Sequence, residues 1–377
     1  MRRFLLLPLL MAVSSFVLAQ NAGSTPAVIT IPVVVHVLYN NAQQNISDAQ
    51  IRSQLDVLNK DYSGTNADRS QTPAYFANLA ADCGFQFKLA SQDPDGLATN
   101  GIVRKYTSIQ YFSNDDRAKS ATNGGDAAWN RDQYLNIWVC NLTGGLLGYT
   151  SAVGCAAEKD GVVISYTAFG TMGTATAPFN GGRTATHEIG HWLNLRHLWG
   201  DTYCGDDGVD DTPQQRASNR GTPTGERFTC GNTAHGDMYM NFMDLTDDAS
   251  MHLFTLGQRQ RMRALFASGG ARQALLSTPA LQQPSALVKA IPSVAETTLP
   301  SSFMVVYPNP ASETIVVDIN TKEAVSGKLV IFNAAGQPVL SQQFNSNHAV
   351  VSISQLPAGI YYLRQGNTGS FVKFMKR

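Results

Sequence analysis

The sequence predicts an α+β domain followed by a small all-β sandwich. Helix-like and strand-like segments mix through the first 270 residues, whereas the last 75 or so hold about seven short strand-like runs. Between them, residues 271–300 are rich in Ser, Pro, Gln and Ala without periodicity, as linkers are. A chain of 377 residues also exceeds what one core usually organises. We therefore expect domains over residues 29–270 and 301–377, joined by a linker over 271–300.

The N-terminus has the pattern of a secretory signal peptide. Arg2 and Arg3 precede an apolar run over residues 4–13, and Ala19 completes a small-residue cleavage pattern. The run is shorter than the roughly 20 residues that a membrane-spanning helix needs, and no later segment qualifies. We expect export, removal of residues 1–19, and a short N-terminal segment over residues 20–28.

The first domain begins with a Val- and Ile-rich run over residues 29–39, which predicts a buried strand. A helical period follows over residues 47–59, with Ser47 as its N-cap. Further strands are predicted over residues 85–89, 102–106, 134–140 and 161–166, and further helices over 184–195 and 255–267.

The final segment has strand-like runs divided by Asn, Gly and Pro turns, typical of a small sandwich. These runs cover residues 303–307, 314–319, 328–332, 339–344, 349–353, 360–364 and 371–374.

Charge gives no sign of a nucleic-acid or anionic-lipid partner. The chain carries 28 basic and 28 acidic residues, without a long run of either sign. Its five cysteines are disulfide candidates in an exported protein, and the odd number leaves at least one thiol unpaired within the chain.

The motif that carries chemistry is HEIGH at residues 187–191. On a helix, His187 and His191 lie one turn apart on the same face, so both can bind one metal ion. Glu188 projects at a different angle and can reach a zinc-bound water, where a general base is needed.

A catalytic zinc site needs a third protein ligand, and His197 follows six residues after His191. A continuous helix would point His197 away from the other two histidines. The helix must therefore end between them, and Asn194 suits the left-handed conformation that stops a helix.

The segment 187–197, HEIGHWLNLRH, resembles the extended zinc signature of metzincins and, within them, of the pappalysin (cytophagalysin, M43) family. Supporting segments are YLNIW at 134–138, GGLLGY at 144–149, DGVDDTP at 207–213 and MNFMD at 240–244. The resemblance covers roughly residues 30–268. It implies a metzincin-like catalytic domain, with a twisted mixed sheet and two helices above the substrate cleft, and an irregular lower subdomain with a C-terminal helix.

The resemblance also implies individual roles. Met243 is expected beneath the zinc ligands as the Met-turn residue, and Asp248 is expected to recognise Arg or Lys after the scissile bond, although a solvated turn explains Asp248 equally well. Leu245 stands where the family usually has a Tyr whose hydroxyl helps to stabilise the tetrahedral intermediate, and Asn194 stands at a usual Gly.

Five acidic residues lie close together between Asp201 and Asp211, a density that suits calcium but also a solvated acidic loop. The resemblance favours structural calcium and implies a Cys204–Cys230 disulfide, whereas the pairing of Cys83, Cys140 and Cys155 stays open. The candidate calcium ligands are Asp206, Asp207, Asp210, Asp211 and Thr212.

The final domain carries YPNPA at residues 307–311, GIYYLR at 359–364 and KFMKR at 373–377. These segments resemble the C-terminal sorting domain of the Bacteroidetes type IX system, which implies contact with outer-membrane secretion machinery. A binding module for carbohydrate or protein is the rival interpretation.

The sequence therefore predicts a secreted or cell-surface zinc endopeptidase acting on proteins or peptides. The alternative is a surface-attached, zinc-binding adhesive protein with little turnover. Glu188 favours the enzyme, because a binding protein needs no base beside the zinc-bound water.

Overall fold

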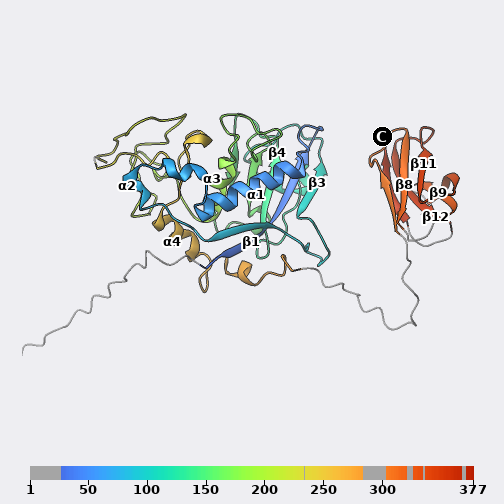
Figure 1. The fold of residues 1–377 in the computed structure, drawn as a ribbon, viewed down its shortest axis with the longest axis horizontal. Helices are drawn as coiled ribbons and strands as arrows, with labels where there is room; N and C mark the ends of the chain where they lie inside the picture. Colours follow the sequence, from blue (N-terminus) through green and yellow to red (C-terminus); the bar gives the residue numbers. More distant parts are fainter. Residues whose placement is uncertain (1–26, 233, 283–302, 321–325, 334–335, 367–370) are drawn as a thin grey trace, which may run out of the picture. The chain divides into compact units, whose positions relative to one another are not determined.

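The computed structural model describes residues 27–377 apart from residue 233 and the segments 283–302, 321–325, 334–335 and 367–370. The predicted signal peptide, most of the predicted N-terminal segment and residues 283–300 of the predicted linker lie outside the described residues. The chain forms two compact units, Met1–Leu287 and Val288–Arg377, each taken by itself below (Figure 1).

The first unit is built on a six-stranded sheet with the order β2-β1-β4-β6-β5, in which β3 shares an edge of β1 with β2. All pairs are parallel except the one between β5 and β6. The strands are β1 (Ile29–Tyr39), β2 (Phe85–Leu89), β3 (Ile102–Tyr106), β4 (Leu135–Cys140), β5 (Gly148–Thr150) and β6 (Val162–Ser165).

Both faces of this sheet are covered, as the unbroken apolar run of β1 requires. The alternate residues Ile31, Val33 and Val35 of β1 join the main core with helices α1 and α3. Their neighbours Val34 and Leu38 instead contact smaller clusters under the loops of the opposite face.

Three predicted helices are present: α1 (Asp48–Ser63), α3 (Arg183–Trp192) and α4 (Leu256–Ala264). The Ser47 side chain caps α1 by accepting a hydrogen bond from Gln50 N, as expected. A short α2 (Ala74–Ala77) was not predicted. Among the described residues, 3-10 turns also form at Ala67–Gln71, Arg117–Lys119, Ala121–Asn123, Ala157–Lys159, Asp248–Ser250 and Gln273–Ser277.

The segment between α3 and α4 has little regular structure, in agreement with the irregular lower subdomain that was expected. The Cys204–Cys230 disulfide forms within it, and Cys83, Cys140 and Cys155 are free thiols. No helix in the described part of the chain is long and apolar enough to cross a membrane.

The first unit continues past residue 270, where the linker was predicted to begin. Arg272 is buried, and Ala280 is fully buried beside Val34, Ala90 and Tyr134. The carbonyl of Ala280 accepts hydrogen bonds from Ser91 N at 2.9 Å and from the next amide at 3.1 Å. Composition misplaced this boundary because a small apolar residue such as Ala280 fills a gap without any periodic pattern.

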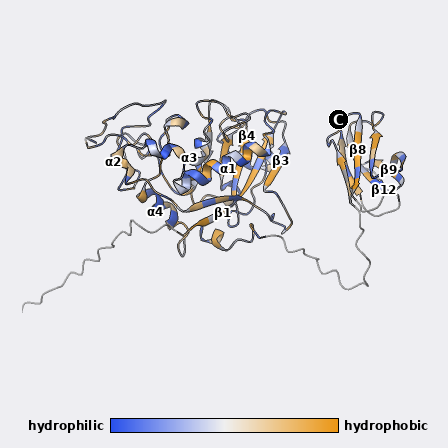
Figure 2. Cartoon of the chain, in the orientation of Figure 1, coloured by the Kyte–Doolittle hydropathy of each residue, from blue (hydrophilic) through white to orange (hydrophobic). Residues whose placement is uncertain are grey.

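The second unit is the expected sandwich of two antiparallel sheets, with strand orders β10-β9-β12-β13 and β11-β8-β7. Inward side chains alternate with exposed ones, and the apolar strands of both units stand out in Figure 2. The strands are β7 (Phe303–Tyr307), β8 (Thr314–Asn320), β9 (Gly327–Asn333), β10 (Pro338–Phe344), β11 (His348–Ser352), β12 (Gly359–Gln365) and β13 (Phe371–Lys376).

Candidate active site

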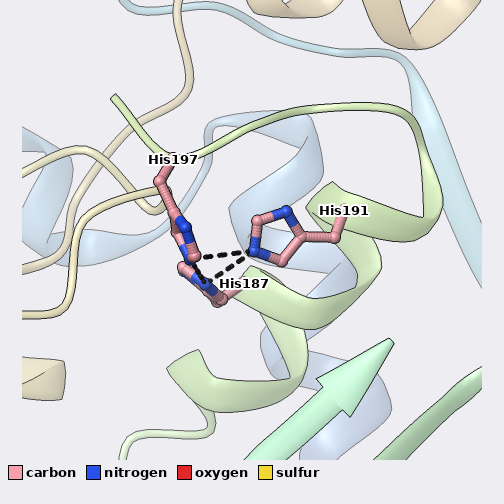
Figure 3. A group of neighbouring side chains, drawn as sticks. All are labelled: His187, His191 and His197. Carbon is pink, nitrogen blue, oxygen red and sulfur yellow. Dashed lines mark hydrogen bonds between the residues drawn. The ribbon is translucent and has the colours of Figure 1, made fainter. Parts of the chain in front are cut away.

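Three histidines converge beside α3 (Figure 3). The Nε2 atom of His187 lies 3.0 Å from that of His191 and 3.2 Å from that of His197, and the last two are 3.1 Å apart. Tetrahedral ligands about 2.0–2.1 Å from zinc are separated by about 3.3–3.4 Å, so the three nitrogens fit zinc after a small expansion.

The turn after α3 brings His197 back to the other two histidines. The helix ends at Trp192, and Asn194 adopts a left-handed φ of 72°. Leu195 N then donates to Gly190 O at 2.9 Å, which closes the turn. The predicted role of Asn194 in ending the helix is thus confirmed.

The other ring nitrogen of each histidine has an acceptor. Nδ1 of His187 lies 2.7 Å from Phe242 O, and Nδ1 of His191 lies 2.9 Å from Leu195 O. Donation from Nδ1 leaves the Nε2 lone pairs directed at the common centre. Burial also lowers the pKa of His187 and His197, which favours the neutral form that binds metal.

Asp201 provides the acceptor for the third histidine, His197. From the sequence, Asp201 was assigned only to the acidic loop. Its carboxylate accepts from His197 Nδ1 at 2.5 Å, and the Trp199 ring stacks on the His197 ring with centroids 4.3 Å apart. The four-residue spacing between His197 and Asp201 was the available signal.

Glu188 follows His187 on α3. Its Oε2 accepts a hydrogen bond from the Thr150 hydroxyl at 2.8 Å, and burial raises the pKa of its carboxyl. Thr150 belongs to β5, the three-residue edge strand. The sequence missed both the strand and this contact, because a strand so short has no readable alternation.

Met243 is fully buried against α3. A Cβ at Gly190 would lie 2.5 Å from the Met243 sulfur, so the glycine of HEIGH makes room for this methionine. The turn is fixed locally, since Asn241 Oδ1 accepts from Met243 N at 2.9 Å. The structure thus places Met243 next to the ligand helix, where the Met-turn was expected.

A cavity of about 230 Å³ opens beside Glu188 and His187. Asp248 lines it, with Oδ2 accepting from Gly181 N at 2.7 Å and Arg183 N at 3.2 Å. Burial raises the pKa of Asp248 to about 6. The solvated-turn interpretation of Asp248 is therefore wrong: only 4% of this residue is exposed.

Leu245 also lines the cavity, where it offers no hydroxyl to a substrate. The complete lining comprises Gly145, Leu146, Leu147, Gly148, Phe179, Arg183, Thr184, His187, Glu188, Arg220, Leu245, Thr246, Asp248 and Met251.

The candidate calcium ligands do not gather around one point. Among the described residues, the three histidines form the only group of three or more metal-ligating side chains close enough to share an ion. Asp207 accepts from the Thr212 hydroxyl, Asp206 accepts from Gly208 N, and Asp211 accepts from Thr255 and Gly257 at the start of α4. Asp210 is exposed.

Each of the two units matches a protein family. Residues 120–267 match the peptidase M43 family described as pregnancy-associated plasma protein-A, and residues 305–376 match the secretion system C-terminal sorting domain. An extracellular metalloprotease of Pyricularia oryzae is 32% identical, covering 68% of this chain and 83% of the relative. One from Verticillium alfalfae is 30% identical, covering 63% and 76%.

Solved structures are closer still. Mature mirolysin of Tannerella forsythia, in complex with a cleaved peptide, is 50% identical with a TM-score of 0.67. The match covers 69% of this chain and all of that one. A promirolysin mutant of the same organism is 51% identical with a TM-score of 0.65, covering 67% of this chain and 85% of that one.

The fold combines a mixed sheet, a helix that carries two histidines of the three-histidine cluster, and a buried methionine packed against that helix. This combination defines the class of metzincin zinc endopeptidases. The activity of this protein is therefore the hydrolysis of peptide bonds. The alternative, an adhesive protein with little turnover, loses its support. The chain belongs to peptidase family M43, the family of pregnancy-associated plasma protein-A. Its sorting domain and extracellular relatives make it a secreted or cell-surface protein.

Proposed function

We propose that this secreted peptidase cleaves before Lys or Arg, with Glu188 as general base and Asp248 as the residue that selects the cation. The observation that carries the proposal is that both carboxylates line one cavity, next to the metal ligand His187. In this proposal, the substrate residue that follows the cut bond occupies that cavity.

His187, His191 and His197 would hold the zinc ion. Bound zinc lowers the pKa of a water molecule and polarises the carbonyl that is attacked. Glu188 accepts the proton of the attacking water and passes it to the departing amine. Thr150 keeps the Glu188 carboxylate oriented through its 2.8 Å hydrogen bond.

The cavity suits one extended side chain. At about 230 Å³ it is smaller than the roughly 300–1,000 Å³ of sites that enclose drug-sized ligands. Both backbone hydrogen bonds to Asp248 use Oδ2, which leaves Oδ1 for a cationic group. Arg183 acts on Asp248 electrostatically, but its salt bridges in the described structure are to Asp61 and Asp68. A cation supplied by the substrate can therefore become the close partner of this buried carboxylate.

The experiment is digestion of denatured casein and a mixed peptide library, followed by sequencing of the new N-termini. We expect Lys or Arg to lead most of the products of the wild-type enzyme. The Asp248→Asn variant should lose that preference while it still cleaves. Products of the wild type that begin with apolar residues as often as with Lys or Arg would refute the specificity.

We also propose that a calcium ion stabilises the loop around Asp207. The Asp207 carboxylate is buried, and its hydrogen bonds come from neutral donors, the Thr212 hydroxyl and Val209 N. Main-chain carbonyls or water would have to complete the ligand set, since the neighbouring carboxylates point elsewhere. Added calcium should raise the melting temperature of the wild type, and Asp207→Asn should abolish that gain.

The C-terminal unit is proposed to engage outer-membrane secretion machinery. The match over residues 305–376 to a secretion sorting domain supports this role. Deleting residues 301–377 should leave an active peptidase inside the producing cell, whereas secretion at the wild-type level would refute the role.

A further inference from the structure

Two arginines line the cavity beside Glu188, and one of them forms no ion pair in the described part of the chain. Arg183 lines the cavity but pairs with Asp61 and Asp68. Arg220 also lines it and is exposed, and it has no hydrogen bond or ion pair within the described part of the chain. A guanidinium that the fold holds at a substrate pocket without a partner is available for an anion.

The backbone of Arg220 is held at this place from both sides. Asn219 N and Nδ2 donate to the Asp244 carboxylate at 2.7 and 2.8 Å. Asp247 N donates to Gly221 O at 2.9 Å. Since Asp244 and Asp247 flank the stretch that supplies Leu245 and Thr246 to the cavity, these bonds hold the backbone of Arg220 at the wall of the pocket.

The charges of the pocket then favour a definite substrate pattern. A Lys or Arg in this cavity carries its charge into a space that Arg183 and Arg220 both line, and like charges oppose its binding. A carboxylate on the neighbouring part of the substrate cancels that repulsion and gives Arg220 a partner. The pocket is thus complementary to a cation followed directly by an anion.

We infer that Arg220 forms a carboxylate-binding subsite at the edge of the pocket. Its ligand is the side chain of an acidic residue that follows the Lys or Arg, or the free C-terminus of a substrate that ends there. The order of cation and anion rests on the proposed preference for Lys or Arg, whereas the carboxylate subsite itself does not.

The test uses the zinc-loaded, full-length enzyme and four peptides that share one sequence up to the cleaved bond. After the bond they read Lys-Glu-amide, Lys-Ala-amide, Lys-Lys-amide and Lys-Ala with a free C-terminus. The value of kcat/KM is measured for the wild type, Arg220→Ala and Arg220→Glu. Arg216→Ala is the matched control, because Arg216 lies in the same segment over the Tyr203 ring and outside the cavity lining.

The wild type and Arg216→Ala should cleave Lys-Glu-amide about 1.5- to 5-fold faster than Lys-Ala-amide, the range for a solvent-exposed ion pair. Arg220→Ala should remove this ratio, and Arg220→Glu should transfer the advantage to Lys-Lys-amide. A faster Lys-Ala acid than Lys-Ala-amide identifies the C-terminus as a second source of the carboxylate. The inference is overturned if Arg220→Ala leaves the ratio of the Lys-Glu-amide and Lys-Ala-amide rates unchanged. It is also overturned if Arg220→Ala changes kcat/KM equally for all four peptides.

Binding provides a second readout. In the zinc-loaded Glu188→Gln variant, the dissociation constants of the same peptides should follow the same order, and Arg220→Ala should abolish it. Peptides with Leu in place of Lys separate the two proposals. If Leu and Lys peptides are cleaved equally, the Lys and Arg preference fails, while a Glu advantage that depends on Arg220 still supports the subsite.

Discussion

Gly190 and Met243 show how single residues fix the metal centre. The glycine is the fourth residue of HEIGH, and its missing side chain is what lets the methionine sulfur approach α3. Both residues can be found in the sequence, but their contact cannot, because it depends on a turn more than fifty positions after Gly190.

Gly190→Ala is therefore expected to destabilise the enzyme although alanine favours helices. The new methyl group would lie 2.5 Å from the Met243 sulfur, and overpacking of this kind costs about 1–3 kcal/mol. Thermal unfolding measures the loss, which Met243→Ala in the same chain should partly restore. An unchanged melting temperature for Gly190→Ala would contradict the tight contact.

The raised pKa of Asp248 predicts that the substrate specificity of the enzyme depends on pH. Because burial raises its pKa to about 6, the carboxyl gains a proton as the pH falls through 6, and its attraction for a cationic substrate disappears. KM for a Lys peptide should therefore rise as the pH is lowered from 7 to 5, relative to KM for the matched Leu peptide. Asp248→Asn should show no such relative change.

The same shift has a defined effect on stability. The folded-state pKa lies above the ordinary 3.8, so the folded protein binds the proton more tightly than the unfolded chain does. The contribution of Asp248 to stability is therefore greatest below about pH 4 and is lost as the pH rises through about 6.

At the scale of elements, the sequence located every α-helix and strand in the described part of the chain except α2 and β5. Val- and Ile-rich runs and helical periods are local signals, and β1, β2 and β3 agree with their predicted limits. The edge strand β5 depends on pairing with β6, which lies later in the chain, so no local pattern predicts it. Thr150, the partner of Glu188, was missed for that reason.

The acidic loop is another element whose role depends on distant contacts. Asp211 accepts from the Thr255 hydroxyl at 2.6 Å and from Gly257 N at 2.8 Å, where it adds to the capping box of α4. This carboxylate stabilises the start of a helix.

Asp211→Ala should therefore lower the free energy of unfolding by about 1 kcal/mol, the usual value of a helix cap. Asp210→Ala is the matched control, because Asp210 is the exposed neighbour and should change little. Chemical denaturation compares the two variants. Equal destabilisation by the two substitutions would show that the negative charge of the loop, and not the helix cap, is what matters for stability.

At the scale of the whole molecule, the sequence predicted two units and their classes, and the zinc motif predicted the centre of the site. The three histidines could be found because their spacing on one helix and one turn is local. The end of the first unit could not, because Arg272 and Ala280 are held by residues far back in the chain.

Arg272 ties this end of the unit to the metal-binding helix. Its guanidinium donates to the Asp160 carboxylate at 2.8 and 2.9 Å and stacks 3.9 Å from the ring of Trp192, the last residue of α3. Trp192 Nε1 also donates to Asp160 at 2.7 Å. The predicted linker therefore contributes to the support of α3.

Arg272→Leu should lower the free energy of unfolding by about 3 kcal/mol, because the buried Asp160 carboxylate loses its closest cation and keeps only the Arg131 guanidinium, 3.6 Å away. The double variant Arg272→Leu/Asp160→Asn should lose less than the single one, since no buried charge remains. Denaturant titration measures both. A single variant as stable as the wild type would show that this end of the unit is dispensable.

The most direct test of the central claim compares the wild type with Glu188→Gln, both loaded with zinc. We expect one zinc ion per chain in each protein, casein cleavage by the wild type alone, and loss of that cleavage in a zinc chelator. Cleavage by Glu188→Gln at the wild-type rate, or no cleavage by a wild type that holds one zinc ion, would contradict the role of Glu188 as general base of a zinc peptidase.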